Sequence, residues 1–285
     1  MTARNTDERG RQDDDTSARG LYVYCIGART ELEPLFAATL PPAIEADAPL
    51  ELIAANDLAA VASLVPLADY GEEALPARLA DATWTALRAM RHERVVEHFA
   101  RRAAVVPLRF GALYLARANV GRMLAERAAE LRAAVERLRG REEWGVQLYA
   151  DRARLLEQIA DLSPRLRELR AQAERATPGQ AYLLQKKIEA LRADETRAEA
   201  RRVAGEIERK LEHASAAAAR LRVLKDEASE HGDTLAKFAF LVERARFAEF
   251  RATAERLADE HAPAGFKLEL TGPWPAYNFA SAQDG

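Results

Sequence analysis

The sequence has a single cysteine, Cys25, among 285 residues. One thiol cannot form an intramolecular disulfide, and a cysteine-based zinc cluster needs more than one. The sequence therefore predicts neither a disulfide-bonded scaffold nor a cysteine-based metal centre, and it fits a reducing cytoplasm. Because Cys25 lies in an apolar run with no basic neighbour, we expect a buried structural thiol rather than a nucleophile.

Long apolar runs are also missing. The longest are interrupted by Arg or Glu within about ten residues, whereas a membrane-spanning helix needs about 20 apolar residues. The N-terminal segment is rich in Arg and Asp and has no apolar core, which excludes a signal peptide. We expect residues 1–19 to form a disordered leader, and we expect a cytoplasmic protein with no lipid-membrane span.

An excess of positive charge is absent as well. The chain has 42 Lys and Arg against 45 Asp and Glu, a formal net charge of -3. Such a balance creates no large basic field, so the composition argues against nucleic acid as a partner. At about 150 residues per domain, the length predicts two domains.

The residues after the leader predict an N-terminal α+β domain over 20–140. Short aromatic and β-branched runs indicate strands, and a proline at position 76 followed by helical spacing indicates a helix start. The expected elements are strands at 21–26, 50–53 and 59–65, helices at 76–102 and 117–139, and a strand that becomes a constrained loop over 103–114.

The next part of the chain predicts a ferredoxin-like C-terminal domain over 141–271, so that the fold class is α+β. Residues 151–229 carry apolar side chains at alternating four- and three-residue steps, which predict a long antiparallel helical hairpin turned at 177–179. Ser163 followed by Pro164 indicates a cap and a fresh helix start. The other expected elements are strands at 143–149, 235–242 and 266–270 and a helix at 244–260.

Motifs for catalysis are not found. The sequence has neither G-x-x-x-x-G-K nor G-x-G-x-x-G, so nucleotide hydrolysis is not expected. His92 and His98 are six positions apart and cannot share a helix face as the zinc motif H-E-x-x-H requires, and we interpret both as surface or capping histidines. We expect no catalytic residue, no cofactor and no metal ligand, and a protein that is not an enzyme.

Two segments point to partner binding. Arg109 lies in an apolar run, where a buried unpaired charge is costly, so it must reach water, a carboxylate or backbone carbonyls. In the tail, 272–285, glycine and two prolines argue against regular structure while three aromatic residues require burial or a partner. A structural role stays open beside the binding role for both segments. The candidate partner-binding residues are Arg109, Phe110, Trp274, Tyr277 and Phe279.

Two distinctive motifs are P-L-R-F-G at 107–111 and G-P-W-P-A-Y-N-F at 272–279. With them, the chain resembles the gas vesicle protein L/F family (GvpL/GvpF) over almost everything after the leader. The other segments that carry the resemblance are Y-V-Y-C at 22–25, H-E-R-V-V at 92–96, W-G-V at 144–146 and P-G-Q-A-Y-L-L-Q-K-K at 178–187.

The resemblance implies a non-enzymatic accessory protein of gas vesicle formation, found at the gas vesicle and in the cytoplasm. It also implies binding to the major shell protein and to other gas vesicle accessory proteins during nucleation or assembly. The residues alone leave two alternatives: a small-ligand-binding regulator or enzyme on a ferredoxin-like scaffold, and a coiled-coil oligomeriser that acts through residues 151–229.

Overall fold

The computed structural model describes residues 18–223, 228–229 and 232–280. They divide into two compact units, the first from Met1–Arg141 with Pro275–Gly285 and the second from Glu142–Trp274. The predicted leader lies outside the described residues except for its last two, and Arg19 begins a strand. None of the described helices is both long and apolar enough to cross a membrane.

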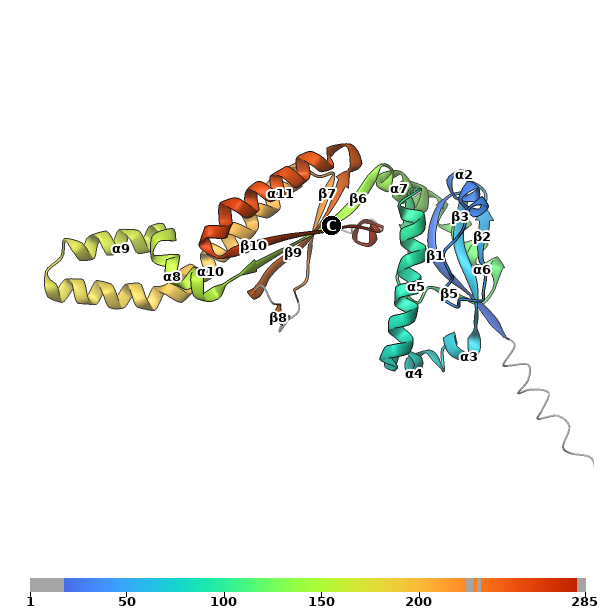
Figure 1. The fold of residues 1–285 in the computed structure, drawn as a ribbon, viewed down its shortest axis with the longest axis horizontal. Coiled ribbons are helices and arrows are strands. Elements are labelled where there is room, and N and C mark those ends of the chain that lie inside the picture. Colours follow the sequence, from blue (N-terminus) through green and yellow to red (C-terminus); the bar gives the residue numbers. More distant parts are fainter. Residues whose placement is uncertain (1–17, 224–227, 230–231, 281–285) are drawn as a thin grey trace, which may run out of the picture. The chain divides into compact units, whose positions relative to one another are not determined.

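The first unit is built around a sheet whose central strand is β1 (Figure 1). β1 pairs antiparallel with β3 along its whole length, from Arg19 opposite Pro66 to Ala28 opposite Leu58. Helices and neighbouring strands bury nearly all of β1, which explains its continuous apolar sequence. The strands are β1 (Arg19–Ala28), β2 (Leu50–Ala55), β3 (Leu58–Pro66), β4 (Val105–Pro107) and β5 (Leu113–Tyr114), in the order β2-β3-β1-β4 with β5 also paired to β1.

The helices of the first unit are shorter than predicted. The Asp81 carboxylate accepts hydrogen bonds from the backbone N–H groups of Thr83 and Trp84 at 2.9 and 3.0 Å. This cap starts a new helix and so divides the one predicted over 76–102. The helix predicted over 117–139 is divided at Arg127. The helices are α2 (Arg29–Leu32), α3 (Leu67–Tyr70), α4 (Leu75–Ala80), α5 (Ala82–Ala100), α6 (Arg117–Glu126) and α7 (Ala128–Leu138), with short 3₁₀ turns at Glu33–Ala37 and Tyr277–Phe279.

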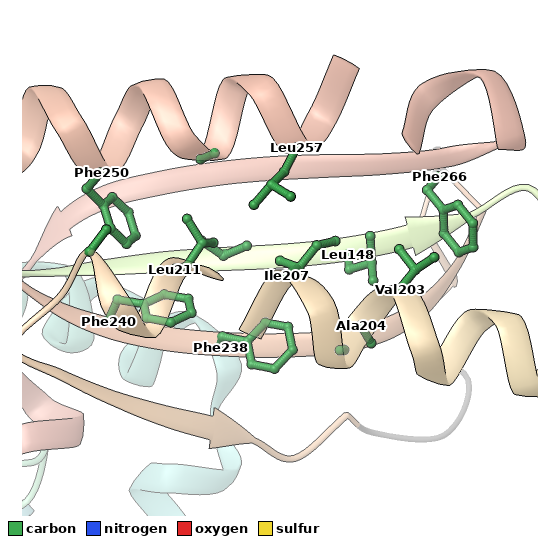
Figure 2. Packing of buried hydrophobic residues seen from close by; sticks show 14 of the residues in the cluster. Leu148, Val203, Ala204, Ile207, Leu211, Phe238, Phe240, Phe250, Leu257 and Phe266 are labelled. Carbon is green, nitrogen blue, oxygen red and sulfur yellow. The ribbon is translucent and has the colours of Figure 1, made fainter. Parts of the chain in front are cut away.

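The second unit contains another antiparallel sheet, with strands in the order β10-β6-β9-β7. Helices α10 and α11 pack their apolar faces against it, and Figure 2 shows Ile207 and Leu211 of α10 with Leu257 of α11 pointing toward strand residues such as Leu148 and Phe240. Both units therefore combine helices with a sheet, and the predicted α+β class is confirmed. The strands are β6 (Arg141–Ala150), β7 (Ala217–Leu221), β8 (Ala228–Ser229), which pairs with β9, β9 (Gly232–Glu243) and β10 (Phe266–Trp274), and α11 spans Phe247–His261 after a 3₁₀ turn at Arg244–Arg246.

The helical hairpin of the second unit is made by α8 (Arg152–Leu162), α9 (Pro164–Glu174) and α10 (Pro178–His213). The Ser163 hydroxyl accepts from the Leu166 N–H at 3.2 Å, so the predicted fresh start at Pro164 is confirmed. Apolar residues of the three helices divide between two clusters. Leu155, Ile207 and Leu211 pack into the core beside the sheet. The far part of the hairpin has its own seam, which consists of Ile159, Leu166 and Leu169 with Leu162, Leu184, Ile188 and Leu191 packed against them.

Two boundaries in the second unit differ from the predictions. The helical region expected to reach 229 ends at His213, and the alanine-rich segment after it forms strand β7, because pairing with β9 overrides the helix propensity of alanine. The tail expected to be irregular from 272 onward instead continues β10 as far as Trp274, which pairs with Glu143 after an irregularity in the register.

Candidate functional site

Four of the distinctive segments meet around His92 in the first unit. The Gly111 N–H donates to the Tyr22 hydroxyl at 3.1 Å, and this hydroxyl bonds to His92 Nδ1 at 2.9 Å. His92 Nε2 bonds to the Tyr277 hydroxyl at 3.1 Å, and that hydroxyl donates to Glu93 Oε1 at 2.9 Å. The Tyr277 hydroxyl donates its proton to the Glu93 carboxylate, so it accepts from His92 Nε2–H. The Tyr22 hydroxyl accepts from the Gly111 amide and donates its own proton to His92 Nδ1. One chain of hydrogen bonds thus joins strand, helix, loop and tail.

Burial sets the protonation state of His92. Its side chain is fully enclosed, and this desolvation lowers its pKa to about 4, with the backbone of Leu108 opposing the shift. The imidazole is therefore neutral at pH 7, as the direction of the hydrogen bonds requires. The prediction of a surface or capping histidine was wrong for His92, because it shares the buried stripe of α5 with Val95, Val96 and Phe99.

The hydroxyls of Tyr22 and Tyr24 and the thiol of Cys25 stay protonated at neutral pH. Burial raises the pKa of Tyr22 and raises that of Tyr24 to about 12. The Tyr24 hydroxyl bonds to Ser63 Oγ at 2.7 Å and accepts from the Ile44 N–H at 2.8 Å. Burial also raises the pKa of Cys25, so the predicted structural thiol is confirmed. This cluster holds segments together and offers no ionised nucleophile at neutral pH.

The P-L-R-F-G loop has one inward and one outward residue. The Phe110 ring meets Tyr22 and His92 edge-on, with centroid distances of 6.1 and 5.8 Å. Arg109 beside it is exposed. Arg109 therefore reaches water, while the contacts of Phe110 and Gly111 fix the loop from within.

Two tail residues belong to the first unit. The Tyr277 ring is packed against the core that contains Tyr22 and lies in the hydrogen-bond chain described above. Phe279 is buried, and its carbonyl accepts from Arg137 Nη2 at 3.0 Å. These two aromatic side chains are used inside the unit, so the structural alternative applies to them.

Trp274 lies in the second unit and has the opposite environment. It is 54% exposed, and its Nε1 donates to Thr271 Oγ1 at 3.2 Å. A Cβ atom placed on Gly272 would lie 3.2 Å from the Trp144 ring and 3.3 Å from the Trp274 ring, so the two indoles flank this glycine. The exposed indole of Trp274 is therefore adjacent to a second, half-buried indole.

Trp144 lines an apolar groove of about 440 Å³ in the second unit. Its ring stacks on Phe247, with centroids 4.1 Å apart and planes 18° from parallel. The Trp144 Nε1–H is buried and has no hydrogen-bond partner among the residues that the structure describes. The rest of the lining comes from one side of α11 and from β10, namely Arg251, Ala254, Glu255, Ala258, Leu268 and Leu270.

The groove runs beside an open strand edge. β10 is the last strand in the order β10-β6-β9-β7, and within the described segments it pairs only with β6. An open edge offers unpaired backbone groups to an extended chain, and an adjacent apolar groove takes alternate side chains of that chain. The groove escaped sequence analysis because Trp144 and Phe247 are far apart in sequence, and only the alternation of Leu268 and Leu270 hinted at it.

Comparison with known proteins identifies the family of this chain. A family profile described as "Gas vesicle synthesis protein GvpL/GvpF" matches residues 20–281, and the chain belongs to this family. The resemblance inferred from the motifs is thereby confirmed. The family is one of gas vesicle structural and accessory proteins, and membership supports a role in gas vesicle formation.

Named relatives include both branches of the family. The chain is 32% identical over 239 residues to gas vesicle protein L of Streptomyces sp. (strain CB03234), covering 81% of this chain and 83% of the relative. It is 26% identical to gas vesicle protein L1 of Halobacterium salinarum, covering 93% and 92%. The crystal structure of GvpF from Anabaena sp. PCC7120 has a TM-score of 0.63 at 17% identity, covering 93% and 97%, and so has a similar fold.

Proposed function

We propose that this protein is an assembly factor that binds an apolar segment of the major gas vesicle shell protein in the groove beside α11. We further propose that the exposed Arg109 and the loop around it contact other gas vesicle accessory proteins. The shell-binding proposal rests on one observation: an apolar groove, an open strand edge and an exposed tryptophan lie together in the second unit.

The chemistry of the groove suits an apolar, extended segment. The backbone of β10 would pair with the segment, and side chains on one face of the segment would pack against Leu268, Leu270 and the Trp144–Phe247 stack. Trp274 would cover the bound segment at one end.

For the second unit we also propose the ferredoxin-like arrangement, and for the chain we propose the domain limits 20–140 and 141–271. With α8, α9, the two-residue strand β8 and the 3₁₀ turns left aside, the elements follow one another as β6, α10, β7, β9, α11 and β10. In the sheet order β10-β6-β9-β7, the first and third strands along the chain, β6 and β9, are central. The second and fourth, β7 and β10, lie at the edges. This order supports a split βαβ unit.

A groove-filling substitution tests the shell-binding proposal. Ala258→Phe places a ring in the groove, whereas Ala252→Phe adds the same ring at an exposed position of α11 outside the lining. We expect Ala258→Phe to weaken binding about 30-fold, the loss of about 2 kcal/mol typical of an interface hot spot. Each variant would be produced together with the shell protein, and the co-purified shell protein quantified.

The control defines the contrary result. Ala252→Phe is expected to bind as the unaltered protein does, and Trp274→Ala to bind more weakly than the unaltered protein. Equal co-purification with Ala258→Phe and Ala252→Phe would remove the groove from the shell-binding site.

A further inference from the structure

Helices α10 and α11 bring three possible metal ligands together on the second unit. Glu206 lies on α10, Glu260 and His261 lie at the end of α11, and one ligand atom from each lies within 4.8 Å of the others. The two helices pack through the core residues Val203, Ile207 and Leu257, which hold their backbones in place (Figure 2). The three ligands therefore stand on a rigid frame rather than on loops.

His261 gives an independent indication of a ligand. Its side chain is 10% exposed, and its ring lies edge-on against Phe266 with centroids 6.1 Å apart. Its Nε2 atom is buried with no hydrogen-bond partner among the residues described, and it points toward Glu206 Oε2 at 3.8 Å. A buried polar nitrogen without a partner is rare, and one aimed at two carboxylates suits a shared cation.

The charges around the cluster show that it already attracts a cation. The Lys210 ammonium bonds to Glu206 and lies 3.7 Å from Glu260 Oε2, so it spans the two carboxylates. Arg202 lies 3.0 Å from Glu206 and Arg256 lies 3.4 Å from Glu260.

We propose that Glu206, Glu260 and His261 bind one divalent transition-metal ion, with zinc as the prototype, which links α10 to α11. Imidazole nitrogen and carboxylate oxygen are both zinc ligands, and water would complete the coordination. A neutral nitrogen donor favours zinc, cobalt or nickel over calcium or magnesium. Lys210 rotates away to solvent when the ion enters, while the arginines continue to orient the carboxylates.

Titration of zinc into the full-length protein, followed by calorimetry, tests this site. We expect one ion per chain, and we expect Co²⁺ to give the visible absorption of a low-coordinate nitrogen–oxygen site. His261→Gln should weaken zinc binding at least about 100-fold, since loss of even an outer-shell partner costs about 10–100-fold. Lys210→Met, which removes the competing cation, should tighten binding.

His213→Gln is the matched control, because it makes the same substitution at an exposed histidine at the end of α10. It should bind zinc as the unaltered protein does. Glu260→Gln should also weaken binding. Because Glu260 is exposed, this variant tests the site even if His261→Gln fails to fold. Zinc affinity that is equal in the unaltered protein and in both His261→Gln and Glu260→Gln, or no binding at all, would overturn the proposal.

Discussion

At the scale of single residues, the most informative side chain is His92. Its burial could have been recognised from spacing, since His92, Val95, Val96 and Phe99 follow one another at helical steps on one face of α5. Its partners Tyr22 and Tyr277 could not be inferred, because they lie 70 and 185 residues away in sequence.

The enclosed imidazole predicts a stability that depends on pH. In the unfolded chain a histidine takes up a proton near pH 6.5, whereas His92 in the folded protein stays neutral down to about pH 4. The unfolded state therefore binds more protons in this window. The contribution is fully present above pH 6.5 and is lost as the pH falls through 4, a change of about 3 kcal/mol in the free energy of unfolding.

Urea denaturation of the unaltered protein and of His92→Gln between about pH 7 and pH 4 measures the contribution of His92 to the free energy of unfolding. The comparison is needed because burial raises the pKa of Glu93, whose contribution has the opposite sign. We expect the stability difference between the two proteins to shrink by about 3 kcal/mol as the pH falls. Parallel pH curves would contradict this assignment.

At the scale of elements, sequence patterns located most helices and strands of the described chain. Alternation and apolar runs located β1, β2, β3 and β6, because their side chains face a core that the pattern itself records. The break between two helices was missed where a single capping residue, such as Asp81, ends one helix and starts the next. β7 was missed because its alanines favour a helix unless a neighbouring strand pairs with them.

The hairpin seam predicts a local effect. Leu166 is fully buried between α9 and α10, so Leu166→Ala should destabilise the hairpin by about 2–5 kcal/mol. Hydrogen exchange should quicken for amides of α9, while amides of β6 and β9 keep their protection. Leu183→Ala removes the same atoms from a leucine that is 67% exposed, and it should change exchange little. Equal effects of the two substitutions would contradict the seam.

At the scale of the molecule, the candidate surfaces are assembled from distant parts of the sequence. The groove combines Trp144 with α11 and β10, and the proposed metal site combines Glu206 with residues more than 50 positions later. Local patterns record which face of an element is apolar, but not which elements become neighbours. Of the candidate residues in the motifs at 107–111 and 272–279, Phe110, Tyr277 and Phe279 pack inside the first unit, whereas Arg109 and Trp274 are exposed.

The return of the tail to the first unit predicts a global effect of truncation. A chain that stops after Trp274 lacks the buried Phe279 and the hydrogen bonds of Tyr277. We expect the first unit to lose at least about 3 kcal/mol, the usual cost of deleting a buried phenylalanine ring. With Trp144 and Trp274 replaced by Phe, fluorescence of the remaining Trp84 follows this unit during denaturation.

Full-length Phe279→Ala, with the same two tryptophan replacements, serves as the companion variant. It should reproduce part of the loss and leave the hydrogen bonds of Tyr277 in place. An unchanged denaturation midpoint in the truncated chain would show that the tail contributes nothing to the first unit.

The division of the chain has a consequence for its synthesis. The second unit is an insertion: the chain leaves the first unit at Arg141, returns at Pro275, and crosses at paired strand ends where Trp274 lies opposite Glu143. The ribosome therefore makes the whole second unit before the residues that close the core of the first. Tyr22 and His92 can complete their hydrogen-bond chain only after Tyr277 has been synthesised. The first unit, although its synthesis starts first, is therefore the last to be completed.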